Sequence, residues 1–381
     1  MNDSTRQEQV LSFLFFDLDA NGAVKAMLTL ARGFIERGFK VDIVVLEAKG
    51  EGFKWLPNEA RVVELKCRNR GFSKLVYLGS LVQYLRKVQP IALIAGDDIN
   101  FGSIAKYLAR VRTRVVINSQ TNLSNLFLKY SPRRVRVSPT AFLLRRFLWF
   151  YDWADALVPV SQGVADDLTQ IAGRSLKHMR VIHNPVVTPK LFEQAKEPID
   201  REWFKDGAPP VILGVGRLSL QKDFPTLIRA FTIVRKQLPA RLMILGEGEE
   251  RPQIEAMIKE LGLASEVALP GFVSNPYAFM SRAAVFVLSS VYEGLPTVLI
   301  EAMAVGTPVV STDCPSGPRE ILGFGKYGML VPVRDFEALA NAIVTTLSDQ
   351  TDVEGLRQQA QKFSLENTVN GYLELINPDA A

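Results

Sequence analysis

The stretch AVFVLSSVYEGLPTVLIEAMAVGTPVVST (residues 284–312) passes from an apolar run into a polar loop, then into apolar residues at helical spacing and a second apolar run. This pattern predicts a strand at 284–290, a helix at 297–305 and a strand at 308–312. A helix that joins two short apolar strands is typical of a parallel crossover, in which helices cover both faces of the sheet. The stretch therefore predicts an α/β architecture built on a parallel sheet.

The same alternation continues on both sides of this stretch. Apolar runs predict further strands at 11–16, 41–46, 92–96, 114–119, 156–160, 180–185, 211–216, 241–246 and 266–271. Helical spacing predicts further helices at 24–37, 103–111, 162–172, 224–237, 251–261, 335–348, 353–363 and 363–376. Because two such series follow one another, we predict two Rossmann-like doubly wound domains that face each other across a cleft.

A polar segment at 191–208 interrupts the alternation, and we interpret it as the interdomain linker. The linker separates an N-terminal domain at 1–190 from a second domain at 209–364. Residues 365–381 follow the second domain and begin with an amphipathic helical pattern.

The composition excludes several classes of protein. The chain has 381 residues, of which 48% are apolar and 22% charged, as in soluble globular proteins. Two His and two Cys argue against zinc clusters, a His-dependent triad and a disulfide framework, and we expect no pairing of Cys67 with Cys314. There is no apolar run of about 18 residues, and residues 1–10 lack the apolar core of a signal peptide. We therefore expect a cytoplasmic protein.

The net charge of +5 hides an asymmetry between the two halves. Residues 1–200 carry 29 basic and 19 acidic side chains, whereas residues 201–381 carry 16 and 21. No acidic residue lies between Asp98 and Asp152, although ten Lys and Arg do. Halves of opposite sign indicate two domains with different partners.

The segment GVGRLSLQKD (214–223) ends a predicted strand at Gly216 and places Arg217 and Lys222 before a predicted helix. Glycines let backbone N–H groups approach an anion, and two cations beside a helix N-terminus favour a diphosphate. The alternative is a turn whose Arg and Lys face solvent. Because Gly-x-Gly-Arg is a weak motif, this segment alone favours the alternative.

Glu293 and Glu301 are separated by seven residues. Glu293 lies in a loop after a predicted strand, and Glu301 lies within a helix on an otherwise apolar face. An ionised carboxylate accepts two hydrogen bonds at once and suits the hydroxyl pairs of sugars and ribose. The alternative is a helix-capping Glu293 and a surface Glu301, but a charged residue among apolar ones is costly unless it has a partner, which favours a functional role.

These segments resemble the donor-binding domain of the family 4 retaining glycosyltransferases, which have the two-domain GT-B fold. Five segments match in the family's order: GVGRLSLQKD (214–223), LMILGEGEERPQIEAMIKELGL (242–263), GFVSNPY (271–277), VFVLSSVYEGLPTVLIEAMAVGTPVVSTDCPSGPREIL (285–322) and GMLVPVRD (328–335). The first half matches more loosely, at 21–52, 152–168 and 181–186.

The resemblance implies a role for each matching residue. Arg217 and Lys222 hold the diphosphate of a nucleotide-sugar donor, Glu293 bonds hydroxyls of the transferred sugar, and Glu301 bonds the ribose. Glu293, Arg217 and Lys222 are thus the implied catalytic residues. Backbone groups of Gly294, Leu295 and Pro296 face the sugar and the phosphates, and Gly216 also belongs to the implied donor site. Asn21 and Gly22 occupy the glycine-rich loop of the first domain, close to the diphosphate. The nucleobase lies against the loop 271–277, which begins with Gly271, Phe272 and Val273. The resemblance also implies transfer with retention, a UDP-linked donor, no metal and no cofactor, and a closing helix that crosses back to the first domain.

The first domain departs from the family's pattern. NGAVK (21–25) replaces a glycine-rich loop that often contains Glu and Arg, so Val24 stands where Glu is usual and Lys25 where Arg is usual. Many relatives have a His near the reacting centre, where this chain has Gln120, Thr121 and Asn122. The resemblance therefore supplies no His at this position that could act as a general base. A departing phosphate that takes the acceptor proton would not need one.

Two features bear on the acceptor. Asp97 and Asp98 follow a predicted strand, and with Thr121 and Asn122 they are candidates for acceptor contacts, although turn formation explains the two Asp about as well. The segment 127–151 combines six Lys and Arg with aromatic and apolar residues, as a membrane-contacting surface would. The alternative is a solvated loop followed by a helix packed on the core. Nucleic acid would also attract such a patch, but no nucleic-acid-binding module is recognisable.

The two histidines lack the spacing of ligands. We expect His178 to be exposed and His183 to form structural hydrogen bonds.

Three functions remain open. The first is transfer of a hexose or N-acetylhexosamine from a nucleotide sugar to a lipid-linked or polysaccharide-precursor acceptor in bacterial surface glycan or glycolipid synthesis, at the inner face of the membrane. The second is the same chemistry on a soluble acceptor. The third is a catalytically silent sugar-nucleotide-binding protein; an epimerase of the same fold is more distant, because its catalytic acids cannot be placed.

Overall fold

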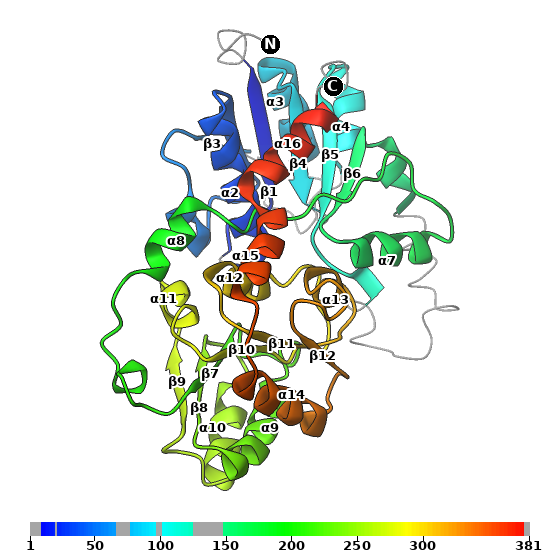
Figure 1. The fold of residues 1–381 in the computed structure, drawn as a ribbon. Coiled ribbons are helices and arrows are strands. Elements are labelled where there is room, and N and C mark those ends of the chain that lie inside the picture. Colours follow the sequence, from blue (N-terminus) through cyan, green and yellow to red (C-terminus); the bar gives the residue numbers. More distant parts are fainter. Residues whose placement is uncertain (1–8, 20, 66–76, 97–100, 125–147, 377–381) are drawn as a thin grey trace. The chain divides into compact units, whose positions relative to one another are not determined.

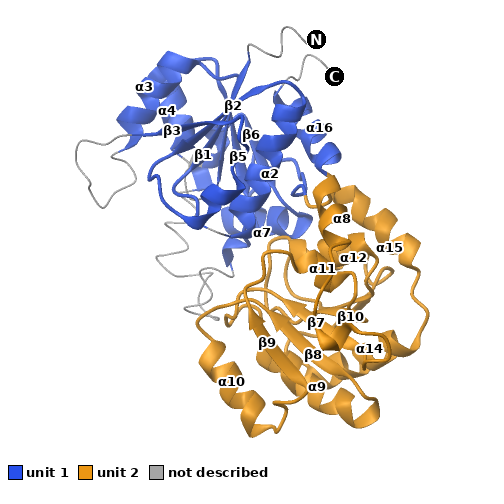
Figure 2. Cartoon of the chain, turned by 90° about the vertical axis from the view of Figure 1, so that its left-hand side faces the viewer, with its two compact units in different colours: residues 1–185, 365–381 blue, residues 186–364 orange. Residues whose placement is uncertain are grey.

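This computed structural model describes residues 9–19, 21–65, 77–96, 101–124 and 148–376. The chain divides into two compact units, coloured separately in Figure 2. Unit 1 contains residues 1–185 and 365–381, and unit 2 contains residues 186–364.

Unit 1 is built on one parallel sheet of six strands in the order β3-β2-β1-β4-β5-β6 (Figure 1). Its strands are β1 (Val10–Phe15), β2 (Lys40–Val45), β3 (Arg61–Glu64), β4 (Ala92–Gly96), β5 (Arg114–Ser119) and β6 (Ala156–Pro159). Its helices within the described residues are α2 (Gly22–Glu36), η1 (Glu51–Trp55), α3 (Leu78–Val88), α4 (Gly102–Ala109), η3 (Trp149–Trp153), α7 (Gln162–Ala172) and α16 (Leu365–Ile376).

Alternate residues of the unit 1 strands enter two different cores. Phe13 and Ile43 pack with α2 and α16 on one face, whereas Leu14 and Val44 pack with α3 and α4 on the other. Because successive side chains of a strand point to opposite faces, apolar runs without polar alternation produce a sheet that is covered on both sides.

Unit 2 repeats this architecture with the strand order β12-β11-β10-β7-β8-β9, again all parallel. Its strands are β7 (Val211–Val215), β8 (Arg241–Leu245), β9 (Val267–Gly271), β10 (Val285–Leu288), β11 (Val309–Thr312) and β12 (Met329–Val331). Its helices are α8 (Pro189–Ala195), η4 (Glu202–Phe204), α9 (Phe224–Gln237), α10 (Arg251–Glu260), α11 (Pro276–Met280), α12 (Thr297–Val305), α13 (Pro318–Ile321), α14 (Phe336–Ser348), α15 (Val353–Ala360) and η5 (Gln361–Phe363).

Counted within its own unit, each sheet has the order 3-2-1-4-5-6 of the doubly wound fold, so the predicted α/β class with two Rossmann-like domains is confirmed. In such a sheet the connections reverse direction between strands 1 and 4, which are β1 and β4 in unit 1 and β7 and β10 in unit 2. The predicted cleft between the domains stays a prediction.

The structure divides the chain at Pro185, five residues before the expected end of the first domain. The expected linker, 191–208, lies in unit 2 and contains the end of α8 and the short helix η4. The α8 end is anchored on α11, because Asn275 Nδ2 donates to the carbonyl of Gln194 at 2.8 Å. Residues 365–376 form α16 in unit 1.

The strand predicted at 180–185 is wrong. This segment runs along β6, and the Arg180 and Ile182 amides donate to the carbonyls of Leu157 and Pro159 at 2.9 and 3.2 Å. Pro159 has no N–H to return a bond, so the ladder stops there and the segment stays irregular.

Candidate active site

Two of the predicted segments meet at the strand reversal of unit 2. The loop 216–223 follows β7 and the loop 289–296 follows β10, and these strands are neighbours in the sheet although not in the chain. The Val291 amide donates to the Gln221 carbonyl at 2.9 Å and joins the two loops. In doubly wound sheets, ligands bind beyond the carboxyl ends of the strands at this reversal.

Lys222 and Glu293 form an ion pair across the two loops. The Lys222 ammonium lies 2.6 Å from Glu293 Oε1, and the Ser290 hydroxyl donates to the same oxygen at 2.6 Å. Gln221 Nε2 lies 3.5 Å from the other carboxylate oxygen. Glu293 is only 6% exposed, and a buried carboxylate without partners is costly. The ammonium and the hydroxyl offset that cost.

Ser290 and Gln221 were not among the residues selected from the sequence. Ser290 lies three residues before Glu293 in the same loop, and its hydroxyl is the kind of donor that a buried carboxylate needs. Gln221 directly precedes Lys222, and its side chain also donates to the Tyr292 carbonyl at 3.0 Å. Both side chains hold Glu293 in place.

Cys314 lies near this pair but is not a nucleophile. Burial raises the pKa of the Cys314 thiol, and the Glu293 carboxylate shifts it in the same direction. A thiol whose pKa is raised stays protonated and unreactive. Cys67 lies outside the described residues.

Arg217 lies in the same loop as Lys222 but points elsewhere. Its side chain is 74% exposed, and its Nε donates to Glu249 at 3.2 Å. An exposed ion pair contributes between about 0 and 1 kcal/mol, so this contact holds the guanidinium only weakly.

Glu301 is buried within α12 and is not a surface residue. It is 4% exposed, and the Tyr277 hydroxyl donates to its Oε1 at 3.3 Å. Tyr277 belongs to α11 and ends the segment 271–277 that the resemblance implies for the nucleobase. Its bond to Glu301 was not predicted, because nothing in the sequence alone indicates that α11 and α12 pack together. The structure therefore supplies the partner that a carboxylate on an apolar helix needs.

Two glycines let the loops of the site approach closely. A Cβ at Gly246, which has φ +142°, would lie 1.9 Å from the Gly216 carbonyl oxygen. A Cβ at Gly317, which has φ +97°, would lie 2.4 Å from Pro296 Cδ and 3.2 Å from the Gly294 carbonyl oxygen. Only glycine fits at both positions, so these residues shape the predicted donor loops without contacting the pair themselves.

The predicted nucleobase loop begins at the end of β9. Gly271 closes the strand with φ +86°, Phe272 is 64% exposed, and Val273 is half-buried. Within the loop 289–296, Leu295 is 7% exposed.

In unit 1, Asn21 and Gly22 lie at the N-terminus of α2. Asn21 Oδ1 accepts from the Val24 amide at 3.0 Å and caps the helix. A Cβ at Gly22 would meet nothing within 4 Å, so the neighbouring protein does not require glycine there. Val24, which replaces the usual Glu of the family, is 8% exposed and belongs to the core beside α2.

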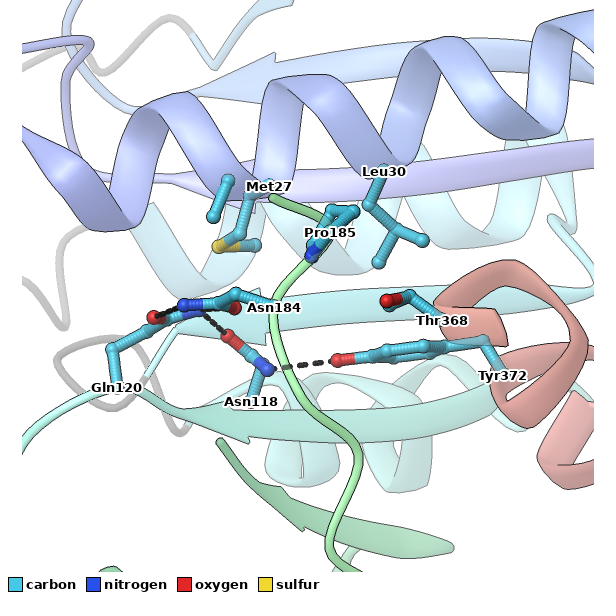
Figure 3. Close-up of a pocket in the computed structure, with 9 residues that line it drawn as sticks. Met27, Leu30, Asn118, Gln120, Asn184, Pro185, Thr368 and Tyr372 are labelled. Atoms are coloured by element: carbon cyan, nitrogen blue, oxygen red, sulfur yellow. Dashed lines mark hydrogen bonds between the residues drawn. The ribbon is translucent and has the colours of Figure 1, made fainter. Parts of the chain in front are cut away.

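At the end of β5, Gln120 is held by the amides of Asn118 and Asn184 (Figure 3). Thr121 is half-buried and Asn122 is 5% exposed. Asp97 and Asp98 lie outside the described residues.

The remaining predicted features have varied outcomes. Within the described ranges no group of three or more His, Cys, Asp and Glu could hold a metal ion, and none of the helices described there has the length and apolarity needed to cross a membrane. His178 is exposed, and His183 is half-buried with its carbonyl accepting from Thr368 at 3.0 Å. Most of the segment 127–151 lies outside the described residues; Trp149 is 62% exposed.

Comparison with known proteins agrees with this geometry. Two doubly wound units in one chain are the architecture of the GT-B fold. A family model described as Glycosyltransferase Family 4 matches residues 20–189, and one described as Glycosyl transferases group 1 matches residues 195–363. The chain belongs to glycosyltransferase family 4.

Among curated relatives, the chain is 30% identical over 351 residues to the N-acetylgalactosamine-N,N'-diacetylbacillosaminyl-diphospho-undecaprenol 4-alpha-N-acetylgalactosaminyltransferase of Campylobacter jejuni, covering 90% of this chain and 91% of the relative. It is 28% identical over 267 residues to the lipopolysaccharide core biosynthesis glycosyltransferase LpsE of Rhizobium meliloti, covering 66% and 75%. Among solved structures, Anabaena HepE in complex with UDP and glucose matches with a TM-score of 0.75 at 21% identity, covering 97% of this chain and 100% of HepE.

Proposed function

We propose that this glycosyltransferase moves a hexose or N-acetylhexosamine from a UDP-sugar to a lipid-linked or polysaccharide-precursor acceptor in bacterial surface glycan synthesis, with retention of configuration. The observation that carries the proposal is the Lys222–Glu293 pair at the strand reversal of unit 2, where a cation and a sugar-binding carboxylate are needed together. The Campylobacter and Rhizobium relatives act in lipid-linked and lipopolysaccharide glycan synthesis, which supports the acceptor class. Anabaena HepE binds UDP, which supports the nucleotide.

In this proposal the donor diphosphate forms an ion pair with the Lys222 ammonium. It also binds Arg217, whose side chain leaves its weak contact with Glu249. Glu293, relieved of part of its pairing, accepts hydroxyls of the transferred sugar. In the proposal, Glu301 accepts the ribose hydroxyls and the nucleobase stacks on the exposed ring of Phe272.

The proposed reaction forms a bond between the acceptor oxygen and the sugar C1 and breaks the bond between C1 and the β-phosphate oxygen. The departing phosphate takes the proton of the acceptor hydroxyl, so no protein base is required. The chain contributes Lys222 and Arg217, whose charges stabilise the phosphate as negative charge develops on it.

A thermal-shift panel of nucleotide sugars tests the donor, with UDP-N-acetylgalactosamine and UDP-glucose beside GDP- and ADP-linked sugars. The best binder is then incubated, with and without EDTA, with a polyprenyl-diphosphate-linked oligosaccharide that ends in N-acetylgalactosamine. We expect UDP-sugars to stabilise the protein, transfer to continue in EDTA, and the product to keep the donor's anomeric configuration by NMR. Stabilisation without transfer to this or any glycan acceptor would instead indicate a catalytically silent binding protein.

The second part of the proposal is peripheral contact with an anionic membrane through 127–151. Within the described part of this segment, the large side chain of Trp149 is exposed, and Trp153, just beyond it, is 51% exposed. Trp is favoured at membrane interfaces, and each basic residue near an anionic leaflet contributes about 1 kcal/mol.

A further inference from the structure

Gln120 and Asn184 form a reciprocal amide pair at the carboxyl end of the unit 1 sheet (Figure 3). Gln120 Nε2 donates to Asn184 Oδ1 at 3.0 Å, and Asn184 Nδ2 donates back to Gln120 Oε1 at 2.7 Å. Gln120 Nε2 also donates to Asn118 Oδ1. Each end of the Gln120 amide therefore has a complementary partner, which fixes its orientation.

The pair continues into the closing helix. Asn118 Nδ2 donates to the Tyr372 hydroxyl at 2.7 Å, and Tyr372 lies in α16. Asn118, Asn184 and Tyr372 are 2%, 6% and 1% exposed, and burial raises the pKa of the Tyr372 hydroxyl, which stays neutral. Met27 and Leu30 of α2 form the apolar wall of the same narrow pocket (Figure 3).

The partners of Gln120 select a carboxamide at this position. Its hydrogen bonds to Asn118 and Asn184 use two acceptors, Asn118 Oδ1 and Asn184 Oδ1, and one donor, Asn184 Nδ2. A carboxamide supplies two N–H groups and one oxygen, whereas a neutral imidazole supplies one N–H and a carboxylate supplies none. The residues around position 120 are thus matched to Gln, and a His there would leave one buried acceptor without its donor.

A set of hydrogen-bonded polar side chains that is largely buried is more demanding than apolar packing, because every buried member must be satisfied. Gln120 directly follows the carboxyl end of β5, and doubly wound sheets bind ligands at this edge. Gln120 also directly precedes Thr121 and Asn122. Locking the Gln120 side chain also fixes the backbone that carries these two residues.

We propose that Gln120, Asn184, Asn118 and Tyr372 are positioning residues for the acceptor: they hold the chain after β5 so that Thr121 and Asn122 meet the acceptor sugar. This inference rests on the proposed function, because it assumes that a glycan acceptor binds at this edge. Tyr372 stands at the end of the hydrogen-bond chain that is farthest from Thr121, so it acts through Asn118 and touches no substrate.

Two substitutions test the proposal at different points of the set. Asn184→Asp replaces the amide that donates to Gln120 Oε1 by an acceptor, which favours a reorientation of the Gln120 amide. Tyr372→Phe removes the hydroxyl that holds Asn118 and leaves its Nδ2 with the Val158 carbonyl at 3.5 Å. The matched control is Tyr84→Phe, because Tyr84 is also buried in unit 1 and its hydroxyl also bonds a buried partner, Asp42, at 2.6 Å.

The readout is the KM for the polyprenyl-diphosphate-linked acceptor and for the best UDP-sugar, with the thermal midpoint of each variant. We expect the acceptor KM to rise about 2- to 10-fold in Asn184→Asp and Tyr372→Phe, as for a lost hydrogen bond, while the donor KM stays unchanged. Tyr84→Phe is expected to lower the thermal midpoint with no change in acceptor KM.

The positioning role would be overturned if the acceptor KM stayed unchanged in both variants. It would also be overturned if kcat and donor affinity fell together, in proportion to the fall in thermal midpoint, as expected for a general loss of stability. The wild-type chain separates this failure from that of the proposed function. Absence of wild-type transfer with every UDP-sugar would refute the proposed function and this inference with it, whereas normal wild-type transfer with unaltered variants refutes the inference alone.

Discussion

Glu293 is paired with Lys222 before any donor is present, so each partner compensates the burial of the other. Replacing the carboxylate by a carboxamide keeps the shape but removes the charge. We expect Glu293→Gln to lower kcat about 10²-fold or more, because the sugar hydroxyls lose the ionised acceptor that holds them in place. Steady-state transfer with the best UDP-sugar measures the effect.

The control for this substitution is Glu255→Gln, which removes an exposed carboxylate that pairs with Arg251 at 2.8 Å on α10. It should leave kcat unchanged. Full activity of Glu293→Gln would show that the carboxylate does not contact the reacting sugar.

Glu301 tests a different part of the donor. We expect Glu301→Ala to weaken UDP binding about 10- to 100-fold, the range for losing a hydrogen bond to a charged group, with a smaller effect on the turnover of bound donor. Isothermal titration with UDP measures the affinity. Equal UDP affinity in the wild type and Glu301→Ala would remove the ribose-binding assignment, whereas Tyr277→Phe, which leaves the carboxylate in place, should weaken UDP binding less.

Residue spacing and chemistry singled out the two carboxylates of the site, and the family resemblance added Arg217 and Lys222, but neither indicated the neutral side chains that bond the carboxylates. Glu293 and Glu301 stand out because a carboxylate among apolar residues is costly to bury unless it has a partner. Ser290, Gln221 and Tyr277 are common residue types, and their contacts depend on which loops and helices pack together. That packing is a property of the folded chain and is not visible in local sequence.

Among the elements, α16 is the one whose removal is most informative. Val369, Tyr372 and Ile376 are all buried in the core beside α2, and a Cβ at Gly33 of α2 would lie 2.6 Å from Val369 Cγ2. A chain ending at Ser364 loses these side chains, each worth about 1.5–3 kcal/mol of burial. We therefore expect a lower thermal midpoint and faster proteolysis of unit 1.

A chain ending at Ile376 is the matched control, because it keeps α16 and loses only residues 377–381. If both truncated chains unfold at the wild-type temperature, α16 does not support the unit 1 core.

Elements with strong periodicity were predicted to the residue, including the helices 162–172, 224–237 and 297–305. The helix α3, the short strands β3 and β12 and the helix α8 were not predicted. β3 shows no buried residue in its pattern, so it lacks the apolar run that marks a strand. The strand expected at 180–185 failed for a different reason: its apolar sequence is suitable, but its neighbour contains Pro159. Local sequence does not reveal the neighbour.

Over the whole molecule, the charge is unevenly distributed along the chain. Ten Lys and Arg and no acidic residue lie between Asp98 and Asp152, and the exposed side chains of Trp149 and Trp153 lie at the end of this stretch. We expect the chain to sediment with phosphatidylglycerol vesicles at low salt and to be released at high salt. The double substitution Trp149→Ser and Trp153→Ser should weaken vesicle binding roughly 30-fold, since two half-exposed rings contribute on the order of 1 kcal/mol each.

Phe324→Asn is the control for this experiment, because Phe324 is an 82% exposed aromatic residue of unit 2 with a backbone conformation that Asn tolerates. It should bind vesicles like the wild type. Binding that is insensitive to salt and to the Trp substitutions would contradict membrane contact through this surface, and transfer to a soluble acceptor would then be the better interpretation.

Unit 1 is assembled from two separate parts of the chain, and this has a consequence during translation. The ribosome synthesises all of residues 186–364 before it reaches α16, so unit 2 is complete while unit 1 still lacks its last helix. Until then the side of α2 at Leu30 and Gly33 lacks the helix that packs on it, and the buried amide of Asn118 has no Tyr372 hydroxyl to bond. Unit 1 therefore stays unfinished throughout the synthesis of unit 2, and this surface of unit 1 is one that a chaperone would have to protect.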